Sequence, residues 1–127
     1  MDKNYFSFEK LNVWQESRNL VKDIYLLLRE FPMEEKYALC DQIRRAVVSV
    51  PSNIAEGAGR MSPKEKSHYI EIAFGSLMEV GCQLDIAYEL AYITQEELSA
   101  SEEQVRRVAA MLSGLKRKKL EEKPLIH

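Results

Sequence analysis

The stretch that decides the fold is Gln42-Ile-Arg-Arg-Ala-Val-Val-Ser-Val-Pro-Ser-Asn-Ile-Ala-Glu-Gly-Ala-Gly-Arg60. Its apolar residues recur every three or four positions, the spacing of one face of an α-helix. The middle, Ala-Val-Val-Ser-Val, would also suit a short strand ended by Pro51. Helical spacing on both flanks favours a helix, which we expect to bend at Pro51 because proline leaves the carbonyl of Val47 without its usual donor. Gly57 and Gly59 predict a left-handed stop at its end.

Three further segments show the same helical spacing, and prolines mark the boundaries between pieces. Asn12, with Gln15 three residues later, predicts a capping box for the first helix, and Ser62-Pro63-Lys64-Glu65 predicts one for the third. The fourth helix begins after Thr94 or at Ser101, since each has an acid or amide three residues on. The predicted helices cover about residues 11–31, 34–57, 63–92 and 95–119.

Short loops between four amphipathic helices predict an all-α fold, an antiparallel up-down-up-down four-helix bundle whose second helix bends at Pro51. A chain of 127 residues fits a single domain, residues 1–127. In the third helix, Ala73, Gly75 and Ser76 indicate a place where another backbone comes close.

The composition limits the cellular compartment and the binding partners that can be predicted for the protein. Cys40 and Cys82 lie in apolar-periodic helical stretches, where we expect small buried side chains rather than a disulfide framework, so the reducing cytoplasm is the predicted location. The N-terminus lacks the features of a signal peptide, and no apolar run is long enough to cross a membrane. The net charge of −2 gives the whole chain no drive toward nucleic acid, although a local basic face is possible.

The sequence offers little enzymatic chemistry. Glu65-Lys-Ser-His68 matches the Glu-x-x-His of di-iron sites, but such sites need two of these motifs and two further glutamates, and the other histidine is His127. Neither cysteine has a histidine at helical spacing, and Gly57-Ala-Gly59 lacks the pattern of a phosphate-binding loop. We therefore predict a non-enzymatic protein without metal or cofactor.

Polar residues follow helical spacing along one side of the second helix and continue on the third. As a structural network, this cluster would satisfy the bent helix, with Arg45 meeting Glu56 or Glu79. As a functional surface, it would form a groove for a ligand or partner. The balance of acids and bases favours the structural interpretation. The cluster comprises Arg44, Arg45, Ser49, Asn53, Glu56, Arg60 and Glu79.

A basic run lies near the C-terminus: Arg106, Arg107, Lys116, Arg117, Lys118 and Lys119. Such a run is typical of a solvated helix end, where cations face unpaired carbonyls. It could also hold phosphates, in which case binding should weaken steeply with salt. Because no aromatic residues interleave the run, stacking on single-stranded bases is not indicated.

Three aromatic residues, Tyr5, Phe6 and Phe8, precede the first helix. They either fold back on their own bundle or dock on a neighbouring subunit, since exposed aromatic patches tend to mark interfaces.

Four motifs occur in order: Phe8-x-x-Leu-x-Val-Trp-Gln15, Phe31-Pro32-x-x-Glu35, the stretch from Gln42 to Arg60, and Glu71-Ile-Ala-x-Gly-Ser-Leu-x-Glu79. On these motifs the chain resembles the bacterial four-helix-bundle proteins encoded by intervening sequences of 23S ribosomal RNA genes. The resemblance implies an antiparallel bundle that assembles into a ring-like homopentamer. It also implies kinship with the accessory protein of diversity-generating retroelements, a basic pentamer that binds reverse transcriptase and nucleic acid. No catalytic residues are associated with the family.

We therefore predict a cytoplasmic, non-enzymatic, homo-oligomeric bundle that binds RNA or a nucleic-acid-processing protein as an accessory. The alternative is a protein-binding scaffold with no nucleic-acid contact, motivated by the acidic balance of the chain and by its N-terminal aromatic residues.

Overall fold

The computed structural model describes residues 6–121, and the side chains of residues 6–118. Within this part the chain is all-helical, with no strand, so the prediction of an all-α four-helix fold is confirmed. No helix in it is both long and apolar enough to cross a membrane. The elements are the 3-10 turns η1 (Ser7–Lys10) and η2 (Met33–Glu35), and the helices α1 (Asn12–Leu28), α2 (Leu39–Ala58), α3 (Pro63–Glu89) and α4 (Gln95–Glu121).

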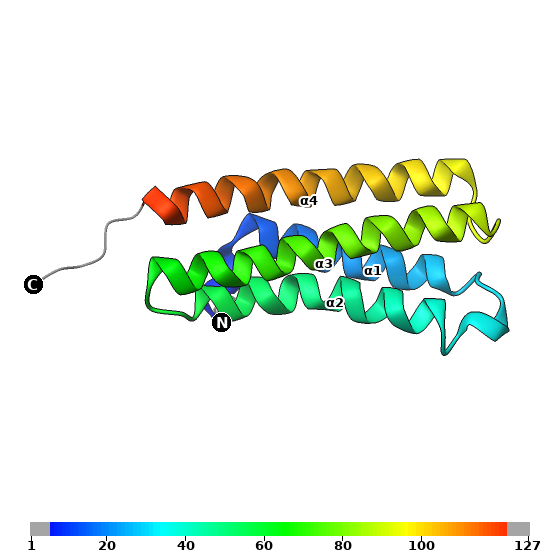
Figure 1. Ribbon diagram of the computed structural model, residues 1–127, viewed down its shortest axis with the longest axis horizontal. Coiled ribbons are helices and arrows are strands. Elements are labelled where there is room, and N and C mark those ends of the chain that lie inside the picture. Colours follow the sequence, from blue (N-terminus) through cyan, green and yellow to red (C-terminus); the bar gives the residue numbers. More distant parts are fainter. Residues whose placement is uncertain (1–5, 122–127) are drawn as a thin grey trace, which may run out of the picture.

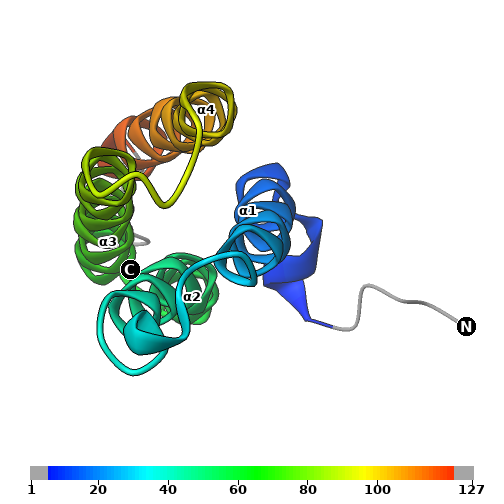
Figure 2. The ribbon, with the colours of Figure 1, turned by 90° about the vertical axis from the view of Figure 1, so that its right-hand side faces the viewer.

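The four helices pack side by side, and consecutive helices run in opposite directions (Figure 1). The α1–α2 and α3–α4 connections therefore lie at one end of the bundle, and the α2–α3 connection lies at the other. Seen along the bundle, the helices follow one another around a common centre in chain order (Figure 2). The α2–α3 interface is the most extensive and the α1–α4 interface the least. All four helices contribute buried apolar side chains to one core, among them Leu20, Ile43, Val47, Leu77 and Leu112.

Two helix starts follow the predicted capping chemistry. At α3 the Glu65 backbone N–H donates to the Ser62 hydroxyl at 3.1 Å. At α4 the Glu97 N–H donates to Thr94 Oγ1 at 3.1 Å, and the Thr94 N–H donates to the Glu97 carboxylate at 2.8 Å. This reciprocal pair satisfies two backbone donors that lack a partner within the helix. It selects Thr94 over Ser101, which is buried inside α4.

The predicted cap of α1 is wrong. Asn12 is the first helical residue, and the preceding Leu11 makes no side-chain cap. The Gln15 side chain instead donates to the Glu9 carbonyl at 2.7 Å, which ties α1 to η1. The turn before α1 thus draws the amide away from the position that a capping box would require.

The α1–α2 connection is longer than predicted, because α1 ends at Leu28 instead of residue 31 and α2 begins at Leu39 instead of residue 34. The Glu35 carboxylate accepts from the Leu39 N–H at 3.4 Å and from the Tyr92 hydroxyl at 2.8 Å. The second bond joins this connection to the α3–α4 connection. Donation to Glu35 is the main reason that the pKa of Tyr92 is raised.

The left-handed helix stop falls at a different place from the predicted one. Gly57 is buried within α2, and Gly59 has φ −87°, which is right-handed. Among the described residues the left-handed position is Ala91, with φ 63°, directly after α3. There the Tyr92 N–H donates to the Ala87 carbonyl at 2.9 Å, and the Ala91 N–H donates to the Tyr88 carbonyl at 2.9 Å. Such bonds at a left-handed helix end resemble the Schellman arrangement, in which glycine is the usual residue.

The α2–α3 interface is the place of closest approach. A Cβ atom on Gly57 would lie 2.9 Å from Tyr69 Cβ and 3.4 Å from the Lys66 carbonyl oxygen. Farther along, the Ser49 and Ser76 hydroxyls are hydrogen-bonded at 2.8 Å. Of the residues predicted to mark close packing, Gly75 does not: a Cβ atom there would meet nothing within 4 Å.

Two further expectations concern single residues. Cys40 is buried, as expected, but Cys82 is exposed, because it lies on the outer side of α3. The alternative of a strand before Pro51 is wrong, since α2 continues through Pro51 to Ala58. The bend at Pro51 stays a prediction.

We predict that Gly57→Ala destabilises the protein. Alanine favours a helix by about 1 kcal/mol over glycine, but the new methyl group would overlap Tyr69 Cβ, which cannot rotate away from its own backbone. Overpacking of this kind typically costs about 1–3 kcal/mol. Urea unfolding measures the net effect.

The matched control is Gly75→Ala, also within a helix but with open space around the new methyl group. It should raise the free energy of unfolding by up to about 1 kcal/mol. A Gly57→Ala protein as stable as the Gly75→Ala protein would contradict close packing at Gly57.

Candidate functional site

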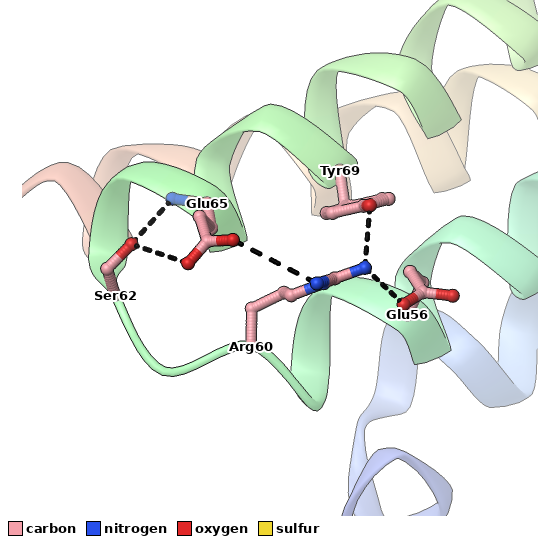
Figure 3. Close-up of polar contacts among 5 residues, drawn as sticks. All are labelled: Glu56, Arg60, Ser62, Glu65 and Tyr69. Atoms are coloured by element: carbon pink, nitrogen blue, oxygen red, sulfur yellow. Dashed lines mark hydrogen bonds and ion pairs between the residues drawn. The ribbon is translucent and has the colours of Figure 1, made fainter.

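The predicted polar cluster divides into three groups, two of which lie along the seam between α2 and α3. The first surrounds Arg60 at the α2–α3 connection (Figure 3). The Arg60 guanidinium bonds to Glu56 at 2.7 Å and to the Tyr69 hydroxyl at 2.8 Å, and it lies 3.9 Å from Glu65. Its carbon also stands 4.7 Å from the centre of the Tyr69 ring. Arg60 thus joins the end of α2 to the first turns of α3.

The second group lies mid-seam. The Asn53 side chain donates to the Ser49 carbonyl at 2.8 Å and to the Ser49 hydroxyl at 2.9 Å, and that hydroxyl also pairs with Ser76. A half-buried chain of bonds therefore crosses from α2 to α3. Each of these polar groups has a protein partner, which removes most of the cost of burying it.

The third group lies near the start of α2. Arg45 is 81% exposed and pairs with Asp41 at 3.3 Å, one helical turn earlier. The predicted pairing of Arg45 with Glu56 or Glu79 is therefore wrong. Glu79 instead accepts from the Gln83 side chain at 3.2 Å. Asp41 lies one turn before Arg45 on the same helix, so this pair forms within α2.

Arg44 is directed away from the seam, toward the α1–α2 connection. Its guanidinium donates to the Lys36 carbonyl at 2.7 Å and stands 4.0 Å from Asp41. Arg44 and Arg45 therefore lie on two different surfaces, although they are adjacent in the chain. In the rest of the cluster the observed bonds are mostly internal, which favours the structural interpretation of Ser49, Asn53 and Arg60.

The basic run on α4 does not form one uniform face. Arg107 lies 3.6 Å from Glu103 and 3.9 Å from Glu16, so it faces α1. Lys116 bonds to Glu71 on α3 at 2.8 Å, which lowers the pKa of that carboxyl. Arg106, Arg117 and Lys118 are exposed, and none of them forms an ion pair with a described side chain. The side chain of Lys119 lies outside the described residues.

The N-terminal aromatic residues contact their own bundle. The Phe8 ring lies edge-on to Trp14 with centroids 4.9 Å apart, and Phe6 stacks on Phe8 at 5.5 Å. Phe8 and Trp14 also border a shallow depression with Pro51 of α2. Tyr5 lies outside the described residues. A role in a subunit interface stays a prediction.

The Glu65-x-x-His68 motif has ordinary structural partners. Glu65 is occupied by Ser62 and Arg60, and the His68 ring lies against Tyr69. Within residues 6–121, no three histidine, cysteine or acidic residues come together as a set of metal ligands.

A family model described as 23S rRNA-intervening sequence protein matches residues 9–114. The chain belongs to this family. A crystal structure of a protein with unknown function, from the S23 ribosomal protein family of Bacteroides thetaiotaomicron VPI-5482, has a similar fold, with a TM-score of 0.77. The alignment covers 83% of this chain and 95% of that one at 22% identity, so the likeness shows the fold alone. Among curated proteins none matches the chain.

Sequence reasoning missed a cavity of about 340 Å³ at the α1–α2 connection, lined by Arg29, Lys36 and Arg44 among others. The first two belong to a connection that was predicted to be mostly helical. The signal available was Pro32, before which a helix tends to end, with Arg29 and Lys36 on either side of it.

The Glu71–Lys116 pair predicts a pH dependence. Because the folded-state pKa of Glu71 is lowered, chiefly by the hydrogen bond from Lys116, the pair stabilises the fold above the ordinary glutamate pKa. That contribution is lost as the pH falls through the lowered pKa. Carbon-13 NMR titration should show the pKa of Glu71 rising toward its ordinary value in Lys116→Met.

The control is Lys118→Met, which removes the same charge from an exposed position on α4. It should leave the titration of Glu71 close to that of the unchanged protein. Identical Glu71 titrations in the unchanged and Lys116→Met proteins would show that the bond does not persist in solution.

Proposed function

We propose that this protein is a non-enzymatic RNA-binding accessory that works as a homo-oligomer. The observation that carries the proposal is the exposure of Arg106 and Arg117 on one side of α4, in a chain that belongs to the 23S rRNA-intervening sequence protein family. Their positions differ by three turns of an α-helix, so the two side chains share a face about 16 Å apart along its axis.

The surroundings of these two arginines suit phosphate groups. Neither has an acidic side chain within 4.0 Å among the described residues, in contrast to Arg107 and Lys116. Ala110 and Ser113 lie on the same side of α4 between the two arginines, and their short side chains leave room there for an RNA strand. Lys118 adds a charge at the C-terminal end. Arginine recognises phosphate through paired N–H donors.

Contacts to phosphate position a nucleic acid but carry no sequence information. The basic run contains no aromatic residue on which a base would stack. We therefore infer that α4 holds the RNA backbone without choosing its sequence. Affinity should fall with salt, by about 0.7 in the logarithmic slope for each phosphate contact to a single strand.

The test compares the Arg106→Gln/Arg117→Gln protein with the unchanged protein in filter binding of oligouridylate across a salt series. The double variant should bind more weakly, and its salt slope should be smaller by about 0.7 for each phosphate that the removed arginines neutralise. An Arg18→Gln/Lys22→Gln control removes the same charge from exposed positions of α1. It should bind nearly as well as the unchanged protein.

An equal weakening in both double variants would indicate general charge attraction and contradict an α4 site. Absence of RNA binding even at low salt would overturn the proposal. It would favour the alternative, a protein-binding scaffold.

The exposed side of α3 supports self-association. Ile72, Cys82 and Ile86 recur at helical spacing and are exposed, with Ile86 44% accessible, and Met78 and Leu90 add further apolar surface at the flanks. Exposed apolar surface beside polar residues, here Glu79, marks many protein interfaces.

Ile86→Glu should therefore weaken the oligomer. Multi-angle light scattering should give a multiple of 14.7 kDa for the unchanged protein and a shift toward the monomer mass for the variant. Leu26→Glu, at a comparably exposed position of α1, is the control and should leave the mass unchanged. A monomeric mass for the unchanged protein would refute self-association, whatever the outcome of the RNA experiment.

A further inference from the structure

The cavity at the α1–α2 connection has the size of a small-molecule site. Its volume is about 340 Å³, within the range of about 300–1,000 Å³ typical of ligand pockets. The end of α1, the 3-10 turn η2 and the first turns of α2 form its walls. Its lining includes Tyr25, Arg29, Phe31, Met33, Lys36 and Arg44.

The charged part of the lining is entirely positive. Arg29, Lys36 and Arg44 border the cavity, and no carboxylate of the described residues does. One N–H of the Arg44 guanidinium donates to the Lys36 carbonyl, at 2.7 Å. A guanidinium has five N–H donors, so this bond fixes the group at the wall and leaves donors for a ligand.

Two of the nearby acids are engaged elsewhere. Glu35 accepts from the Tyr92 hydroxyl at 2.8 Å and is thereby directed toward the α3–α4 connection. Asp41 is shared, at 3.3 Å from Arg45 and 4.0 Å from Arg44. Arg29 has no acidic partner within 4.0 Å among the described side chains. The cavity therefore keeps an excess of positive charge that its own walls do not neutralise.

The remaining lining is apolar and includes aromatic rings. Phe31 is buried and packs against Tyr92 with centroids 5.4 Å apart, so its position is fixed. Tyr25 is 41% and Met33 80% exposed, which makes them available to a ligand. Aromatic rings and thioethers make favourable contacts with a flat ring. The cavity thus combines a cationic side with a surface suited to an aromatic group.

We propose that this cavity binds a phosphate monoester that carries an aromatic group, as a nucleoside monophosphate does. Three bases favour a phosphate monoester, which carries a charge of about −1.5 to −2 at neutral pH, over a carboxylate with one charge. The arginines supply paired N–H donors for its oxygens. This site is independent of the α4 surface, and it holds whether or not α4 binds RNA.

The test titrates the full-length protein with adenosine 5′-monophosphate by calorimetry, with adenosine and ribose 5-phosphate as partial ligands. The whole nucleotide should bind more tightly than either part. In amide NMR spectra its largest shifts should fall between residues 25 and 44. Equal binding of adenosine, no saturable binding at millimolar concentration, or shifts centred elsewhere would overturn the proposal.

The variant Arg29→Gln should weaken nucleotide binding roughly tenfold or more, since bonds between charged groups are the strong ones. The matched control, Arg18→Gln, removes an exposed arginine of α1 that does not line the cavity, and should bind as the unchanged protein does. Both positions are exposed, so both variants should keep the unchanged helical circular dichroism. Equal weakening in the two variants, or none in Arg29→Gln, would also overturn the proposal.

Two sources share this chemistry, a free nucleotide and the phosphorylated 5′ end of an RNA. An oligoadenylate with a 5′ phosphate, compared with the same oligomer lacking it, distinguishes them. Tighter binding of the phosphorylated oligomer than of the mononucleotide, kept in Arg106→Gln/Arg117→Gln, supports the site with an RNA end as its ligand. If the phosphorylated oligomer binds as tightly as the mononucleotide or more weakly, the result supports the site with a free nucleotide as its ligand.

Discussion

The contact between α2 and α3 is the constraint on which the rest of the fold depends. Because Gly57 has no side chain, Tyr69 Cβ can lie 2.9 Å from the position that a Cβ atom of residue 57 would occupy. The Ser49–Ser76 bond fixes the same register farther along. Close backbone approach and a half-buried polar bond together allow little sliding of one helix on the other. The two outer helices, α1 and α4, then cover the remaining sides of this pair.

The two ends of the bundle are secured by different chemistry. At the α2–α3 end, Arg60 reaches two acids and a tyrosine (Figure 3). At the other end, Tyr92 and Glu35 join the two remaining connections through one hydrogen bond. The cationic cavity lies at this second end, whereas the C-terminal end of α4, the part of the helix that contains Arg117 and Lys118, lies toward the first (Figure 1). The two proposed binding surfaces are therefore separated along the bundle, and ligands at one need not compete with ligands at the other.

Helical periodicity was sufficient to predict four helices, and the caps at Ser62 and Thr94 were readable because their partners lie three residues away. Features that depend on residues distant in the chain could not be predicted in this way. The sequence favoured glycine as the left-handed residue, since alanine there costs about 1–2 kcal/mol, yet Ala91 occupies that position beside the Tyr92–Glu35 bond. Ser49 and Asn53 lie together on one side of α2 as predicted, but Arg44 is directed to the α1–α2 connection and Arg45 pairs with Asp41. Helical periodicity indicates the side of a helix on which a residue lies and not its partner.

The small interface between α1 and α4 has a consequence for how the bundle folds and opens. Besides the shared core, exposed contacts join these helices, Gln104 to Asp23 at 2.9 Å and Arg107 to Glu16 at 3.9 Å. Exposed ion pairs contribute only about 0–1 kcal/mol, and the first contact joins residues 81 positions apart in the chain. Contacts that close so long a loop form late. We expect the α2–α3 hairpin to order first, and the backbone amides of α1 to exchange with solvent sooner than those of α2 and α3.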